Sequence, residues 1–180
     1  MAASNSKIQS NLGFLTIVND PTEARIGGLL LVNASGRPLE FHCTAPVKPN
    51  RAQEILYGPT LGEYLCGEQI GMALSEALKH QPTLLLADIP ETLSLRPLIE
   101  FPLLLLASEE NLIKSFGQNF VQMAHNDQTL ATREEYAADL RVAESALQTL
   151  APRLDLREPF GRIREAIAEA QGGMRKSTAA

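Results

Sequence analysis

Two apolar runs, residues 84–87 and 103–107, constrain the fold most, because both come after a long segment with the pattern of a helix, residues 61–80. A strand without a polar side is buried on both faces of a sheet, and a strand that follows a helix commonly lies parallel to its neighbour. We therefore expect a central strand that ends at Asp88, and a further buried strand at 103–107.

Three earlier runs predict an antiparallel meander. Residues 14–18 are apolar and partly β-branched, and an Asn-Asp-Pro turn follows them. Residues 29–32 form a second apolar run, and the turn at 33–36 contains a glycine that tolerates positive φ. Residues 39–44 then alternate between apolar and polar side chains, as a strand with two different faces does.

The helix at 61–80 begins with Thr60 and Glu63 at the spacing of a capping box. Gly67 and Gly71 lie four residues apart inside it, although glycine is a poor helix former. Their common face is expected to lie close to another backbone, and we favour the meander as that neighbour over a second copy of the helix.

The C-terminal region, residues 108–171, is predicted to be helical. Ser108 begins a short helix, and Thr132 with Glu135 begins a helix over 133–150. A last helix covers 159–171, and residues 172–180 are expected to form a flexible tail. The two main helices form a hairpin whose apolar sides must be covered by the body or by a partner.

The predicted fold class is therefore α/β (α+β). A body at residues 1–107 combines the three-stranded antiparallel meander, the long helix and two further strands in one mixed sheet, and the helical hairpin follows it. A length of 180 residues suits one domain of this kind.

Composition excludes several classes of protein. No uncharged run approaches the roughly 18–20 residues of a spanning helix, and the N-terminus lacks the apolar core of a signal peptide. Two cysteines are too few for a disulfide framework, so we expect a reduced, cytoplasmic protein without a membrane partner. A net charge of −5 makes nucleic acid an unlikely partner.

The two most informative carboxylates are Glu68, on an apolar stripe of the long helix, and Asp88. The order of meander, helix and strand with a terminal acid is similar to that of ribonuclease-H-like nucleases, which implies a Mg²⁺ ion held by clustered oxygen ligands. Asp20 or Glu40 would supply a third ligand. The first strand carries Thr16 where those nucleases have an aspartate. Alternatively, Glu68 lies at a helix rim and Asp88 caps a turn.

Glu40, His42 and Thr44 share one face of their strand, so His42 is a candidate catalytic base held by a carboxylate. A solvated polar face is the alternative.

Lys48, Asn50 and Arg51 surround the start of a short helix, where backbone N–H groups favour an anion such as a phosphate. Ordinary capping by Asn50 is the alternative.

No nucleotide-binding, zinc-protease or serine-hydrolase motif is present in the sequence. We therefore expect a non-enzymatic cytosolic protein without a cofactor, which binds itself or another protein through helices 133–150 and 159–171. The alternative function is a Mg²⁺-dependent ribonuclease-H-like nuclease or phosphodiesterase that uses Glu68 and Asp88.

Overall fold

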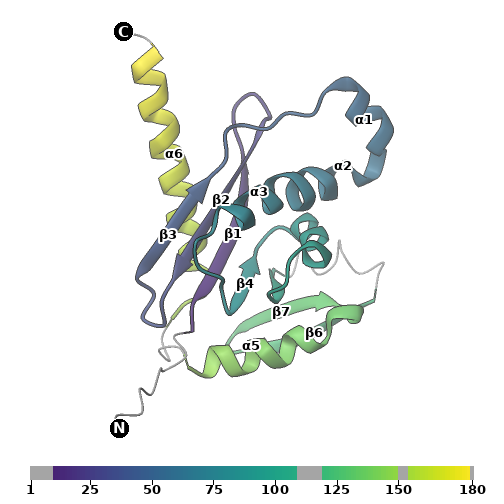
Figure 1. Cartoon of the computed structure of the whole chain (residues 1–180), viewed down its shortest axis with the longest axis vertical. Helices are drawn as coiled ribbons and strands as arrows, with labels where there is room; N and C mark the ends of the chain where they lie inside the picture. The colour runs from purple at the N-terminus through teal and green to yellow at the C-terminus, as the bar shows by residue number, and fades with distance from the viewer. Residues whose placement is uncertain (1–9, 109–118, 150–153, 179–180) are drawn as a thin grey trace.

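The computed structural model of the chain describes residues 10–108, 119–149 and 154–178 (Figure 1). Its strands are β1 (Leu12–Asn19), β2 (Arg25–Val32), β3 (Pro38–Cys43), β4 (Leu84–Ala87), β5 (Leu103–Ala107), β6 (Phe120–His125) and β7 (Gln128–Arg133). Its α-helices are α1 (Arg51–Tyr57), α2 (Leu61–Glu63), α3 (Met72–Ala77), α5 (Ala138–Gln148) and α6 (Glu158–Thr178). Tighter or wider helical turns are η1 (Gly58–Thr60), η2 (Tyr64–Gly71), η3 (Pro90–Leu98) and η4 (Glu134–Tyr136).

The strands form one mixed sheet of seven, in the order β3-β2-β1-β4-β5-β7-β6. The first three strands are the expected antiparallel meander, and β4 and β5 lie parallel to β1. β7 and β6 return antiparallel at the far edge. The predicted α/β class with a mixed sheet is confirmed.

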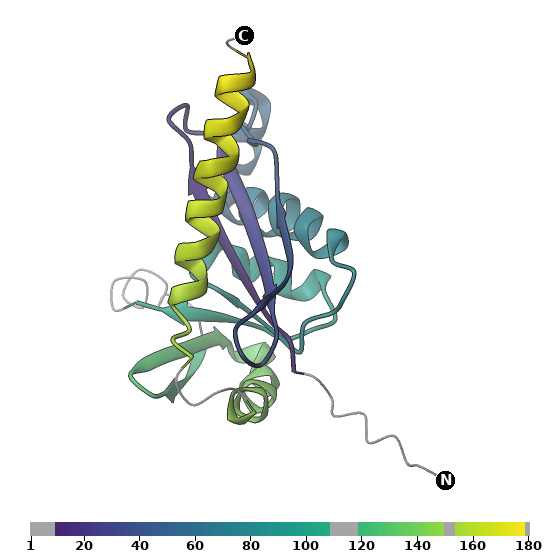
Figure 2. The same cartoon turned by 90° about the vertical axis from the view of Figure 1, so that its left-hand side faces the viewer.

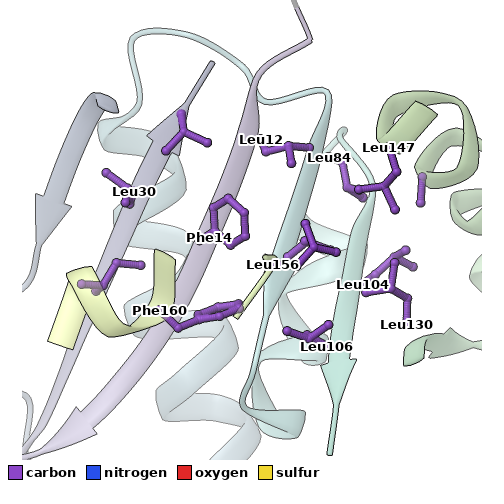
Figure 3. Packing of buried hydrophobic residues seen from close by; sticks show 14 of the residues in the cluster. Leu12, Phe14, Leu30, Leu84, Leu104, Leu106, Leu130, Leu147, Leu156 and Phe160 are labelled. Atoms are coloured by element: carbon purple, nitrogen blue, oxygen red, sulfur yellow. The ribbon is translucent and has the colours of Figure 1, made fainter. Parts of the chain in front are cut away.

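Helical layers cover both faces of this sheet (Figures 1 and 2). On one face, side chains of α5 and α6 pack against the strands, and the rings of Phe14 and Phe160 meet edge to face with their centroids 5.4 Å apart (Figure 3). On the other face, side chains of η2, α3 and η3 cover the sheet. β1 and β4 are apolar on both sides because they lie between these two layers.

Gly27 and Gly28 lie inside β2 rather than in the turn before it, and they let the two layers approach the sheet closely. A Cβ on Gly27 would lie 2.1 Å from Ile70 Cγ2, on the face covered by η2. A Cβ on Gly28 would lie 2.3 Å from Ile163 Cγ2 of α6, on the opposite face. Neighbouring residues of a strand point to opposite faces, so the pair leaves space for one helix on each side.

The long helix forms as predicted from Leu61, but it ends at Ala77 and its middle, η2, is π-helical. Gly67 and Gly71 face neither the meander nor a second copy of the helix. A Cβ on Gly67 would lie 1.9 Å from Ser94 Oγ, and a Cβ on Gly71 would lie 3.0 Å from Leu95 Cδ2. The prediction of the meander as their neighbour was therefore wrong, because these glycines allow η3 to pack closely against the helix.

The prediction of an entirely helical region at 108–171 was wrong, because β6 and β7 form a hairpin there and extend the sheet. α5 begins at Ala138 rather than at 133, since β7 continues to Arg133. α6 continues through the predicted tail to Thr178. The short helix expected after Ser108 lies outside the described residues.

The apolar sides of α5 and α6 are buried against the chain's own sheet, as Leu147, Phe160 and Ile163 illustrate. The predicted partner surface on helices 133–150 and 159–171 is therefore used within the molecule. None of the helices that the structure describes is long and apolar enough to cross a membrane.

The contact between Gly67 and η3 can be tested with a matched pair of alanine variants. We expect Gly67→Ala to lower the free energy of unfolding by about 1–2 kcal/mol, since the overpacking outweighs alanine's higher helix propensity. Gly161→Ala in α6, where nothing lies within 4 Å of the added Cβ, should instead raise it by up to about 1 kcal/mol. Urea denaturation measures both; an equal response of the two variants would contradict the contact.

Candidate functional site

The carboxyl ends of β1 and β4 bring together Thr16, Asp88 and Arg164. Leu15 pairs with Ala87, so Thr16 and Asp88 are the next residues along the two parallel strands, and both face α6. The Arg164 guanidinium of α6 forms an ion pair with Asp88, and its Nη2 lies 3.5 Å from Thr16 Oγ1. In open α/β sheets, ligands bind at this end of the parallel strands.

Burial differs between the members of this site. Thr16 is fully buried, the Asp88 side chain is 16% exposed and the Arg164 side chain is 47% exposed. Burial raises the pKa of Asp88 above its ordinary value, although the hydrogen bond from Thr16 and the charge of Arg164 act in the opposite direction. The arrangement thus presents a guanidinium to solvent and holds it with a partly buried carboxyl group.

The predicted metal ligands do not assemble. Within residues 10–108, 119–149 and 154–178, no three His, Cys, Asp or Glu side chains are placed to hold a metal ion. Glu68 lies exposed on η2, on the other side of the sheet from the Asp88–Arg164 pair. Asp20 closes a turn, where its Oδ1 accepts hydrogen bonds from the backbone N–H groups of Thr22 and Ala24.

The position of Glu68 has a local cause in η2. The helical stripe that placed Glu68 beside Leu65 assumes 3.6 residues per turn, whereas a π-helix bonds each residue to one five positions away. Accordingly Leu65 and Ile70, five residues apart, are both buried, and Glu68 turns outward.

A second cluster forms where β3 meets the chain after α3. Glu40 is 8% exposed, and its carboxylate accepts hydrogen bonds from the backbone N–H groups of Lys79 and His80, at 3.0 and 2.9 Å. His42 Nε2 lies 3.0 Å from Glu40 Oε2, and His80 Nδ1 lies 2.5 Å from Glu40 Oε1. The expected contact of His42 with a carboxylate therefore exists, whereas its catalytic role remains a prediction.

Burial by itself raises the pKa of a carboxyl group, but the hydrogen bonds from Lys79, His42 and His80 outweigh it and lower the pKa of Glu40 to about 2. An ionised carboxylate only accepts hydrogen bonds, so the two ring nitrogens that face it carry protons. The cluster therefore fixes two imidazoles against strand β3.

Thr44, directly after β3, is also used within the fold, since its Oγ1 accepts a hydrogen bond from the backbone N–H of Gly27.

The proposed anion site at Lys48, Asn50 and Arg51 is occupied by protein groups. Asn50 forms a complete capping box with Gln53. Lys48 Nζ donates to the Thr22 carbonyl, and Arg51 pairs with Glu54. The three side chains therefore serve the local structure.

The two cysteines lie in different surroundings. Cys43 is exposed although it is one of the apolar residues in the alternating segment 39–44, because β3 is the edge strand. Cys66 is buried, and Arg25 Nη1 lies 2.8 Å from its sulfur. Burial raises the pKa of Cys66 despite that guanidinium, so its thiol stays protonated.

Sequence reasoning missed Arg164 and His80. Arg164 is a charged residue on an amphipathic helix, and nothing along the chain links it to Asp88, 76 positions away. His80 was taken as the end of a helix that in fact stops at Ala77. The one sequence signal that pointed towards His80 was Glu40 on the polar face of β3, since a buried carboxylate needs a hydrogen-bond donor.

The comparisons with known proteins identify a fold and no family. No model of a known protein family matches the chain, and no curated protein matches it. Among solved structures, the chain is similar to Ciona intestinalis endonuclease V in complex with a 23mer DNA that contains an inosine followed by a ribo-adenosine. The TM-score is 0.50 at 9% identity, over 91% of this chain and 87% of that one. Such a likeness shows the fold alone.

The role of Glu40 can be tested through acid stability. Its pKa falls from an ordinary value of 4.5 to about 2 on folding, so ionised Glu40 contributes stability above pH 4.5 that is lost as the pH falls towards 2. Glu40→Gln should therefore be less stable than the wild type at neutral pH, and the difference should shrink steadily in acid. Chemical denaturation at several pH values measures it.

Glu54→Gln is the matched control, because Glu54 makes an exposed ion pair on α1. We expect its stability to stay within about 0.5 kcal/mol of the wild type across the same range. A constant difference between Glu40→Gln and the wild type from neutral to acid pH would show that the carboxylate charge does not stabilise the fold.

Proposed function

We propose that this chain binds nucleic acid, and that the phosphate backbone contacts it at the carboxyl ends of β1 and β4 through Arg164. The observation that carries the proposal is the half-exposed guanidinium of Arg164, held beside Asp88 and Thr16 at that end of the sheet. The similarity to an endonuclease V structure that contains DNA supports nucleic acid as the ligand.

The chemistry of Arg164 suits a phosphodiester. A guanidinium presents several N–H donors in a planar fork that matches phosphate oxygens, and it keeps its charge at every physiological pH. Asp88 occupies only part of that donor set, and Thr16 adds a hydroxyl beside it. The carboxyl group therefore acts as a positioning residue that orients the guanidinium.

The donor set favours binding over metal-dependent cleavage. A Mg²⁺ site is built from several oxygen ligands, usually with more than one carboxylate. This site combines one carboxyl group, one hydroxyl and one cation, so its charges already balance. A second cation would be repelled by Arg164, which replaces the metal as the group that meets phosphate.

This proposal revises the functional hypothesis drawn from the sequence. The adaptor hypothesis relied on the apolar sides of helices 133–150 and 159–171, which the chain's own sheet covers. From the nuclease hypothesis the proposal retains nucleic acid as the ligand and Asp88 as a site residue. Glu68 is no longer part of the site.

Fluorescence anisotropy with labelled 23mer DNA duplexes, with and without inosine, and with a single-stranded RNA tests the proposal. Arg164→Gln should weaken binding about tenfold, as expected when a charge-assisted hydrogen bond to phosphate is lost. The slope of log affinity against log salt should become shallower by about one. Arg141→Gln removes an exposed arginine of α5 and should leave affinity nearly unchanged.

Asp88→Asn distinguishes binding from cleavage. If Asp88 only orients Arg164, removal of its charge leaves the guanidinium more available, and phosphate binding should be retained or strengthened. If Asp88 were a metal ligand, Mn²⁺- or Mg²⁺-dependent cleavage by the wild type would disappear in Asp88→Asn, and that outcome would overturn the proposal. So would a folded wild type that binds none of the probes.

A further inference from the structure

The open edge of strand β3 carries an apolar surface that no described part of the chain covers. β3 is the outermost strand of the sheet, and it pairs only with β2 among the described strands. Leu39 is 45% exposed and Phe41 39% exposed, and Cys43 is exposed beside them. Figure 1 shows β3 at the margin of the sheet.

The backbone of Phe41 and Cys43 also points outward. The backbone N–H of Thr44 donates to the Gly27 carbonyl, and His42 pairs with Leu29 two positions further along the ladder. Alternate residues of an edge strand direct their N–H and C=O groups away from the sheet, so Phe41 and Cys43 present theirs to solvent. Leu39 lies at the register shift between Glu40, which pairs with Leu31, and Pro38, which pairs with Val32. Edge strands are commonly protected by charged side chains, but these outward-facing residues carry none.

The side chains of β3 are complementary to their own reverse order. If two β3 strands pair antiparallel about a two-fold axis at Phe41, each Phe41 meets the other, and Leu39 lies opposite Cys43 of the second copy. On the other face of the strand, Glu40 lies opposite His42 of the second copy and the reverse. Apolar residues thus meet apolar residues, while each Glu40 carboxylate keeps His42 and His80 of its own chain as partners.

We propose that two copies of this chain pair through their β3 strands, centred on Phe41, to form one continuous sheet. The second copy fits this edge because the register satisfies the outward backbone groups of Phe41 and Cys43 and covers the apolar side chains of Leu39 and Phe41. At the other edge of the sheet, β6 carries no large exposed hydrophobic residue. The pairing is independent of phosphate binding at Arg164.

Disulfide cross-linking tests the register. In an antiparallel pair, hydrogen-bonded partners have Cα atoms about 5.5 Å apart, which suits a disulfide. Leu39→Cys should therefore form a covalent dimer with Cys43 of the second copy under mild oxidation. Within one chain, residues 39 and 43 lie about 13 Å apart and cannot be bridged.

Two control variants separate this contact from random collision. Leu39→Cys combined with Cys43→Ser removes the opposite thiol and should lose the cross-link. Leu98→Cys has a similar starting exposure, 47%, at the end of η3, and should cross-link much more slowly. Cross-linking of Leu98→Cys as fast as Leu39→Cys would overturn the proposal.

Light scattering over a range of protein concentrations tests the pairing without cysteine chemistry. The wild type should show a concentration-dependent dimer, and Phe41→Glu should abolish it, because two like charges then lie directly opposite each other. Leu56→Glu alters a residue of α1 that is 82% exposed, and should leave the dimer intact. A wild type that stays monomeric, or a dimer that persists in Phe41→Glu, would contradict the inference.

Discussion

The fold depends on how closely the two helical layers approach β2, where Gly27 and Gly28 leave space for one side chain each. Ile70 fills the space on one face and Ile163 fills the space on the other. Since η2 and α6 are thereby held on opposite faces, each side chain on a central strand belongs to one layer only. This separation determines which polar residues can meet, and it is why Asp88 contacts Arg164 of α6 and does not join Glu68 of η2.

The sequence predicts the parts of the fold whose signals are local. The apolar runs in β4 and β5 identify buried strands, and the alternation in β3 identifies a strand with one polar face. The β6–β7 hairpin was missed because Thr132 and Glu135 imitate a helix start. The turn between the strands carries two residues common in turns, Asn126 and Asp127, and Asn126 adopts a φ of 54° there. This pair was the signal to follow.

The candidate site was harder to predict, because its members lie far apart in the sequence and because Arg164 resembles the other arginines of the chain. Asp88 could be found, since an acid at the end of a buried strand is unusual. Arg164 could not, since arginines on exposed helix sides are common and others on α6, such as Arg162, form a local pair with Glu158. Glu68 was misplaced because the pattern assumed a regular α-helix, whereas η2 widens to a π-helix.

The identity of the residue at position 164 decides what the end of this sheet can bind. A carboxylate there, beside Asp88, would concentrate negative charge and demand a cation. An arginine instead neutralises Asp88 within the protein and leaves donors exposed to solvent, which is why we propose an anion as the ligand at this place in the fold. Because α6 is anchored by Phe160 and Ile163 in the core, its register on the sheet is fixed and Arg164 cannot be exchanged with its neighbours. The ligand preference that we propose for the site thus depends on one side chain, on a helix whose position is set by packing.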